Sequence, residues 1–188
     1  MSDDLQLIVT TSRLAQTTTR ALARRKATEW GFPYVERSDR SMELTLQDAG
    51  AAFVFRNDGL VLSTTHTQLR FELGTAALRL LSIARGERDW LVNVGELVEG
   101  HRVFDATLGL GRDALVAARA VGPGGEVVGV ESNLALFTLV SEGLALHDAG
   151  AESAAIRPVF GDSREILSRE ADASFDVVVI DPMFALPG

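Results

Sequence analysis

Hydrophobic residues follow two different spacings along the chain, and the change between them predicts two parts. In the first part, the short apolar run at residues 7–9 is typical of a buried strand. A helical pattern follows over about 13–30, which Gly31 is expected to end and Thr11 or Ser12 to cap. Alternating apolar residues predict half-buried strands at 42–46, 53–55, 60–62 and 69–73, with Asn57-Asp58-Gly59 as a hairpin turn. This part is therefore expected to be a small α/β module with antiparallel strands.

A second helical pattern begins at Gly74-Thr75 and continues to Val94, and the turn Glu99-Gly100 is expected to be the domain boundary. Strand and helix patterns alternate after it. The predicted strands are 102–106, 126–131, 156–160 and 175–181, and the predicted helices are about 111–121, 133–147 and 163–170. Such alternation predicts a Rossmann-like parallel sheet with right-handed crossovers. The apolar run at 177–180 is typical of a strand covered on both faces. The predicted domains are residues 1–99 and 100–188.

The turn after the first of these strands reads Asp105-Ala-Thr-Leu-Gly-Leu-Gly-Arg-Asp-Ala114. Glycines at the carboxyl end of a parallel strand expose backbone N–H groups to a nucleotide cofactor. The candidate cofactor-binding residues of this turn are Asp105, Thr107, Gly109, Gly111, Arg112 and Asp113. An acid at 105 suits the amino-acid tail and sulfonium of S-adenosylmethionine (SAM) and would repel the pyrophosphate of NAD. Alternatively, Asp105 only braces the turn.

Acids also end the next two predicted strands. Glu131, with Ser132 beside it, follows Gly109 by 22 residues and can accept hydrogen bonds from ribose hydroxyls. Asp162, with Ser163, can accept from an adenine amino group. The alternative reading is that Asp162 or Ser163 only caps the following helix, and both roles are compatible. The glycine turn and Glu131 alone would suit NAD as well as SAM.

The fourth strand ends in Asp181-Pro182-Met183-Phe184, which resembles the [D/N]-P-P-[Y/F] motif of methyltransferases acting on exocyclic or amide nitrogens. A conjugated amino nitrogen is a poor nucleophile. Asp181 and a neighbouring carbonyl can accept its hydrogens and aim its lone pair at the methyl group, while Phe184 stacks on a planar base. The alternative is an ordinary Asp-Pro turn. We assign the acceptor site to all four residues of the motif.

Together, residues 105–114 and 181–184 resemble the family of ribosomal small-subunit RNA guanine-N2 methyltransferase J and its uncharacterised relatives. Residues 8–12 (Ile-Val-Thr-Thr-Ser) and 33–37 (Pro-Tyr-Val-Glu-Arg) are similar to the relatives' leader module. The resemblance implies a class I methyltransferase fold, SAM as the donor, and a guanine N2 of ribosomal RNA as the acceptor. We expect direct methyl transfer without a metal, since His66, His101 and His147 show no metal-ligand spacing.

The sequence departs from the family in its length, because a class I sheet has seven strands and this chain stops after the fourth. Ala185 also stands where a second proline is expected after Phe184. Two alternatives to an active methyltransferase stay open: a cofactor-binding module without activity, and an NAD-dependent oxidoreductase. An edge strand without its neighbour also predicts a homo-oligomer formed through the exposed sheet edge.

Charge and composition narrow the choice of partner. The net charge of −8 argues against nonspecific nucleic-acid binding. Residues 1–100 are nearly neutral, so they form the side expected to face RNA. Their basic residues are Arg13, Arg20, Arg24, Arg25, Lys26, Arg37 and Arg40. Alternatively, the cluster at 20–26 is a solvated helix face. The absence of cysteine, of a signal peptide and of a membrane-length apolar run agrees with a cytoplasmic protein.

Overall fold

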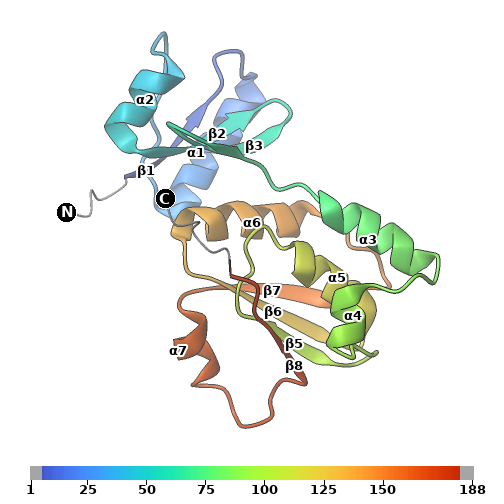
Figure 1. Cartoon of the computed structure of the whole chain (residues 1–188). Helices are drawn as coiled ribbons and strands as arrows, with labels where there is room; N and C mark the ends of the chain where they lie inside the picture. The colour runs from blue at the N-terminus through green and yellow to red at the C-terminus, as the bar shows by residue number, and fades with distance from the viewer. Residues whose placement is uncertain (1–5, 183–188) are drawn as a thin grey trace. The chain divides into compact units, whose positions relative to one another are not determined.

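The computed structural model describes residues 6–182 (Figure 1). They divide into two compact units between Phe71 and Glu72. Met183 and Phe184 of the predicted acceptor motif lie outside the described residues. No helix in the described part of the chain is both long and apolar enough to cross a membrane.

The first unit is built on a four-stranded sheet in the order β1-β2-β3-β4. Its strands are β1 (Leu7–Thr11), β2 (Ala51–Arg56), β3 (Gly59–Thr64) and β4 (Gln68–Leu69). β1 and β2 are parallel, and the other pairs are antiparallel. Arg56 pairs with Gly59 across Asn57 and Asp58, which confirms the predicted hairpin.

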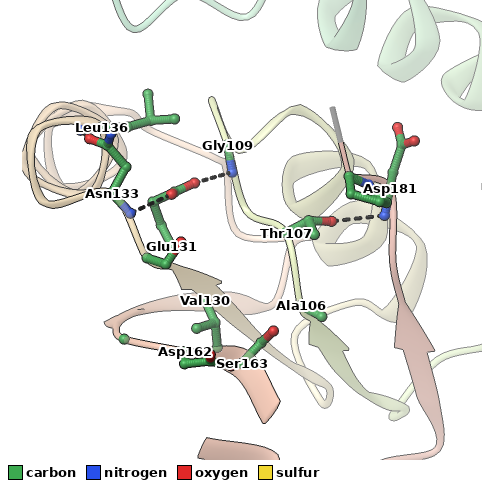
Figure 2. A pocket seen from close by; sticks show the side chains of 13 residues that line it. Ala106, Thr107, Gly109, Val130, Glu131, Asn133, Leu136, Asp162, Ser163 and Asp181 are labelled. Carbon is green, nitrogen blue, oxygen red and sulfur yellow. Dashed lines mark hydrogen bonds between the residues drawn. The ribbon is translucent and has the colours of Figure 1, made fainter. Parts of the chain in front are cut away.

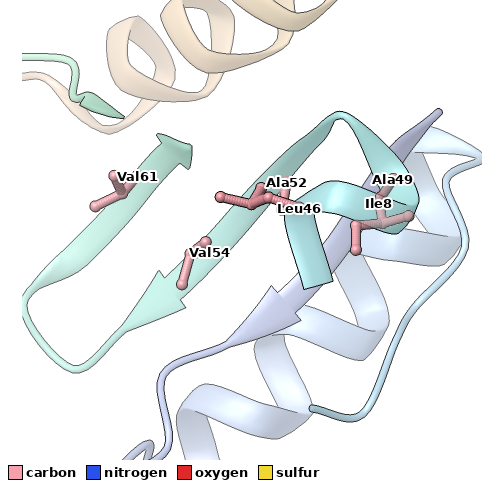
Figure 3. Packing of buried hydrophobic residues seen from close by; sticks show 6 residues of the cluster. All are labelled: Ile8, Leu46, Ala49, Ala52, Val54 and Val61. Atoms are coloured by element: carbon pink, nitrogen blue, oxygen red, sulfur yellow. The ribbon is translucent and has the colours of Figure 1, made fainter. Parts of the chain in front are cut away.

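Helices α1 (Thr17–Trp30) and α2 (Met42–Ala49) contribute to opposite faces of this sheet. Alternate strand residues point to opposite sides. Ile8, Ala52 and Val54 form one buried cluster with Leu46 and Ala49 of α2 (Figure 3). On the other face, the ring of Trp30 packs against Phe53 and Phe55, with ring centroids 5.1 and 5.8 Å away. The small sheet is thus covered by apolar side chains on both faces.

The structure corrects two local predictions in this unit. Residues 42–46 form the start of α2 and not a strand, because Ser41 Oγ caps the helix by accepting from the Leu44 amide at 3.2 Å. Leu44 is 51% exposed, whereas Leu46 is buried, as expected of a helix with one inward face. Helix α1 begins at Thr17 and not near 13, since the Ser12 amide still bonds to Phe55 O beside the sheet. Gly31 ends α1 with a φ of 74°, as predicted.

The second unit contains a parallel sheet in the order β7-β6-β5-β8. Its strands are β5 (Arg102–Asp105), β6 (Glu126–Glu131), β7 (Ala155–Phe160) and β8 (Val177–Val179). Its helices are α3 (Thr75–Ala84), α4 (Trp90–Val94), α5 (Arg112–Val121), α6 (Leu134–Leu146) and α7 (Ser163–Leu167). Figure 1 shows α5 and α6 on one side of the sheet and α7 on the other.

The strand order places a crevice at the carboxyl end of β5. The chain passes from β5 outward to β6 and β7, and then returns to the opposite side of β5 with β8. Such a reversal separates the connections at the carboxyl ends of the central strands, where doubly wound folds bind ligands. The α/β fold class and its alternating elements are therefore as predicted.

Two features of the second unit differ from the sequence pattern. The division between units falls at Phe71–Glu72, whereas the pattern places it near Glu99-Gly100. The reason is that α3 is tied to α5 by an ion pair between Arg79 and Asp113. The run at 177–180 is also not covered on both faces, because Val178 and Ile180 are 44% and 68% exposed.

Candidate functional site

A cleft of about 440 Å³ opens at the carboxyl ends of the parallel strands (Figure 2). Its lining comes from the turns that follow β5, β6, β7 and β8, four segments far apart in sequence. The lining residues are Ala106, Thr107, Gly109, Val130, Glu131, Ser132, Asn133, Leu136, Gly161, Asp162, Ser163, Asp181 and Pro182. Eight of the sequence-predicted site residues are therefore brought to one cleft: Thr107, Gly109, Glu131, Ser132, Asp162, Ser163, Asp181 and Pro182.

Asp105 lies beneath the turn after β5 and does not line the cleft. It is 3% exposed, and its Oδ1 accepts from the Thr107 amide at 3.0 Å. Its other oxygen, Oδ2, is buried without a hydrogen-bond partner within the described residues. Burial raises the pKa of Asp105 to about 7, although the Thr107 amide opposes this, and the carboxylates of Asp113, Asp181 and Glu131 add to the rise. Asp105 thus braces the turn with one oxygen and keeps the other unbonded.

Gly111 is the position where the turn most requires glycine. Its φ is 75°, and a Cβ there would lie 3.2 Å from Val140 Cγ2 of α6. A larger residue would therefore be strained and would push against α6. The close approach lets the glycine turn lie against α6 and lead directly into α5.

Glu131 connects the turn after β5 to the end of β6. Its Oε2 accepts from the Gly109 amide at 3.1 Å, and its Oε1 accepts from the Asn133 amide at 2.7 Å (Figure 2). Asn133 in turn caps α6 by accepting from the Leu136 amide at 3.0 Å. The Glu131 carboxylate is therefore fixed at the cleft. Sequence reasoning missed Asn133 and Leu136, although an Asn before a helical pattern is a recognisable cap.

Asp162 has the capping role that the sequence offers for it, and its cofactor role stays a prediction. It caps α7 by accepting from the Arg164 amide at 2.9 Å, and it also lines the cleft with Ser163. The hydrogen bond from the Arg164 side chain, followed by that from the Arg164 amide, lowers the pKa of Asp162 to about 2. Asp162 is therefore ionised at neutral pH.

The turns after β5 and β8 are joined by two hydrogen bonds. The Ala106 amide donates to Val179 O at 2.9 Å, and the Asp181 amide donates to Thr107 Oγ1 at 2.8 Å (Figure 2). Asp181 is exposed and reaches the same cleft as Glu131. The corner predicted to hold an acceptor thus adjoins the turn predicted to hold a cofactor.

Arg112 and Asp113 do not line the cleft. Asp113 pairs with Arg79, which also binds Asp89 at 2.7 Å, so Asp113 belongs to the link between α3, α4 and α5. The hydrogen bonds that Arg79 donates, first to Asp89 and also to Asp113, raise its pKa. The Arg112 guanidinium lies beside Gly74, where a Cβ would come within 2.9 Å of it. These contacts favour a structural role for both residues.

The sheet order, the glycine turn and the acids at the strand ends fit a class I methyltransferase fold. These acids are Glu131, Asp162 and Asp181. The sequence model of the family described as "Putative SAM-dependent methyltransferase" matches residues 30–187, so the chain belongs to this family of SAM-dependent methyltransferases. This confirms the class of enzyme and the resemblance inferred from the motifs.

Relatives and a solved structure agree with the assignment. The chain is 34% identical to the uncharacterized protein YpiP of Bacillus subtilis, over 96% of this chain and 73% of that protein. It is 43% identical to ribosomal RNA small subunit methyltransferase J of Chromohalobacter salexigens, over 44% of this chain and 34% of that protein. The crystal structure of the SAM-dependent methyltransferase NGO1261 from Neisseria gonorrhoeae shares the fold. Its TM-score is 0.58 at 24% identity, over 94% of this chain and 69% of that one.

Proposed function

We propose that the cleft binds SAM and that the protein methylates an exocyclic amino nitrogen of RNA, with guanine N2 of ribosomal RNA as the acceptor. The observation that carries the proposal is the joining of two turns by the Thr107–Asp181 hydrogen bond. One of these turns has the glycines of a cofactor site, and the other begins the Asp-Pro motif of amino-nitrogen methyltransferases.

The residues of the cleft fit the chemistry of SAM. Carboxylates accept from ribose hydroxyls and amino groups, which suits Glu131 and Asp162. The negative field of the acids at the cleft, with Asp105 beneath the turn, suits a cationic amino-acid tail. Val130 and Leu136 offer apolar contact to an adenine ring. When bound, SAM would supply an electrophilic methyl group.

An NAD-dependent oxidoreductase is disfavoured by two of these acids. A pyrophosphate at the glycine turn would lie close to Asp105 beneath the turn and to the corner at Asp181, and like charges in a partly desolvated site repel one another. The alternative of an inactive cofactor-binding module is separated from our proposal by an activity assay. Both alternatives predict no methyl transfer to RNA.

Asp181 would act on the acceptor nucleotide. Its carboxylate would accept a hydrogen of the amino group, which keeps the nitrogen lone pair out of conjugation and directed at the methyl carbon. Transfer would form the nitrogen–carbon bond and break the carbon–sulfur bond, and the surplus proton would leave to water. Positioning of this kind can supply a large part of a rate enhancement. By the motif, Met183 and Phe184 would complete the site, with Phe184 stacked on the base.

Support for RNA as the substrate comes from relatives that share part of the chain. Ribosomal RNA small subunit methyltransferase J from Chromohalobacter salexigens matches 44% of this chain, and the protein of the same name from Laribacter hongkongensis also matches 44%. An acceptor in ribosomal RNA would place the activity in the cytoplasm.

The test is transfer of a labelled methyl group to unmodified small-subunit ribosomal RNA, followed by digestion to nucleosides. We expect N2-methylguanosine from the wild type and loss of most product from Asp181→Asn. Asp172→Asn changes an exposed acid between α7 and β8 and is the matched control, which should keep the wild-type rate. Product on a different nucleoside would contradict the guanine N2 assignment, and equal rates in both variants would contradict the role of Asp181.

A further inference from the structure

Three arginines of the first unit gather where three parallel backbone segments end. Residues 33–35 run parallel to β1: the Val9 amide donates to Pro33 O at 2.9 Å, and the Val35 amide donates to Val9 O at 2.8 Å. β2 lies parallel on the other side of β1, with Phe55 level with Thr11. Arg37, Arg13 and Arg56 stand at the same edge, at or just beyond the ends of these three segments.

Register places Arg56 beside Arg13. Arg56 is one residue beyond Phe55, and is therefore level with Ser12, which Arg13 follows directly. Arg37 is three residues beyond Tyr34, which pairs with Val9, and the charges of Arg13 and Arg56 both act on it. The three arginines therefore lie at a single edge of the small sheet.

None of these three arginines has a carboxylate partner among the described residues. Arg13 donates to the backbone carbonyl of Asp39, and Arg56 donates to the neutral Gln68 Oε1 at 3.0 Å. Arg37 Nε is buried without a hydrogen-bond partner in the described part of the chain. Burial and then the positive charges of Arg13 and Arg56 lower the pKa of Arg37, as expected for a cation crowded by other cations.

Two of the nearby acids pair with other basic residues. Glu36 pairs with Arg20 and Arg24, each at 2.7 Å. Asp58, which feels the charge of Arg56, is hydrogen-bonded by Arg70 at 3.1 Å. The α1 arginines that the sequence offers as an RNA contact are thus partly neutralised, whereas the edge arginines are not.

We propose that Arg13, Arg37 and Arg56 form a binding site for consecutive phosphates of the RNA substrate. The inference rests on the proposed function, since it names the surface that holds the substrate backbone. Guanidinium groups hold phosphates through paired hydrogen bonds, and three of them at one edge can follow a single strand. Residues 1–71 hold 9 Lys+Arg and 8 Asp+Glu, whereas 72–188 hold 9 and 18. The first unit is accordingly the better side for a polyanion.

The experiment compares two sets of variants of the full chain. The test protein carries Arg13→Gln, Arg37→Gln and Arg56→Gln, and the control carries Arg24→Gln and Arg40→Gln, whose side chains pair with Glu36 and Asp48. Fluorescence anisotropy measures binding of a short single-stranded RNA, and of DNA with the same sequence, over a series of salt concentrations. Binding of S-adenosylhomocysteine and thermal melting show whether each protein stays folded.

We expect the triple variant to lose at least tenfold in affinity for both nucleic acids, with S-adenosylhomocysteine binding unchanged. Each phosphate contact on a single strand contributes about 0.7 to the slope of log affinity against log salt, so the slope should fall by about 2. The control should change less than threefold. An equal loss in the control, or none in the triple variant, overturns the phosphate site while leaving the proposed methyl transfer intact. The phosphate site is also overturned if the triple variant binds RNA as tightly as the wild type but forms less methylated RNA. Failure of the wild type to methylate any RNA instead contradicts the proposed function.

Discussion

The backbone amide of Asp181 donates a hydrogen bond of 2.8 Å to Thr107 Oγ1. Residues 105–111 resemble the methyltransferase turn D-x-G-x-G-x-G, with Thr107 in place of its first glycine. Thr107 therefore supplies a hydroxyl that glycine cannot. The backbone amide of Thr107 also donates a hydrogen bond of 3.0 Å to Asp105 Oδ1. Thr107 therefore links the buried acid under the proposed cofactor site to the corner proposed to hold the acceptor.

Thr107→Ala should separate these two functions. Loss of one hydrogen bond costs about 0.5–1.5 kcal/mol, so we expect kcat to fall roughly three- to tenfold. The affinity for S-adenosylhomocysteine should change less than threefold, since the backbone of the turn is kept. Thr107→Ser retains the hydroxyl and should restore most of the rate. If Ser and Ala variants are equally impaired, the hydroxyl is not the link.

Asp105→Asn should change how stability depends on pH. The raised pKa of about 7 means that the folded protein favours the protonated carboxyl, whereas the unfolded chain releases this proton near pH 4. This group therefore stabilises the fold fully below about pH 4, and its contribution is lost as pH rises towards 7. The variant keeps an acceptor for Thr107 and cannot ionise. Thermal melts of ligand-free protein should show Asp105→Asn gaining stability over the wild type at pH 8 and not at pH 4.5. A constant difference at both pH values would contradict the raised pKa.

The sequence predicts a helix or strand well where neighbouring residues determine it, and poorly where residues far apart in the sequence do. The strands of the second unit and the acids at their ends follow from local pattern, because a parallel strand and its turn are encoded by neighbouring residues. The strand predicted at residues 42–46 is wrong because Met42 and Leu46, four residues apart, fit a helix as well as a strand, and the Ser41 cap favours the helix. Asp113 lies inside the motif, yet its partner Arg79 is 34 residues away and has no local signal.

Arg79→Met should destabilise the second unit by removing the cation shared by Asp89 and Asp113. The Asp89 side chain is 5% exposed, so the variant leaves a buried carboxylate unpaired. Breaking a fully buried pair costs about 3–5 kcal/mol, and the partial exposure of Arg79 and Asp113 suggests about 2–3 kcal/mol here. Urea unfolding measures the loss. Arg119→Met removes an exposed pair with Glu152 and serves as the control, expected within about 1 kcal/mol. Equal losses in both variants would argue against the link.

Val178→Lys should reduce self-association of the 188-residue chain. Within residues 6–182, β8 pairs with β5 alone, and both Val178 of β8 and Ile180 just after it are exposed and apolar. An unpaired strand edge beside apolar surface favours pairing with another copy, and a lysine on it opposes pairing. Light scattering at micromolar concentration should show dimers or larger species for the wild type and fewer for the variant. A monomeric wild type would contradict the proposed contact.

The central claim is that the cleft beside Glu131 binds SAM, and calorimetry tests it most directly. We expect S-adenosylhomocysteine to bind the wild type and NAD to show no binding under the same conditions. Glu131→Gln keeps an acceptor but loses the charge, so we expect affinity to fall roughly tenfold or more, in line with about 1.5–3 kcal/mol for a charged hydrogen bond. Thermal melts of the variant check that the Gly109 and Asn133 amides still hold the turn. Binding of NAD in preference to S-adenosylhomocysteine, or unchanged affinity in a folded Glu131→Gln protein, would contradict the account.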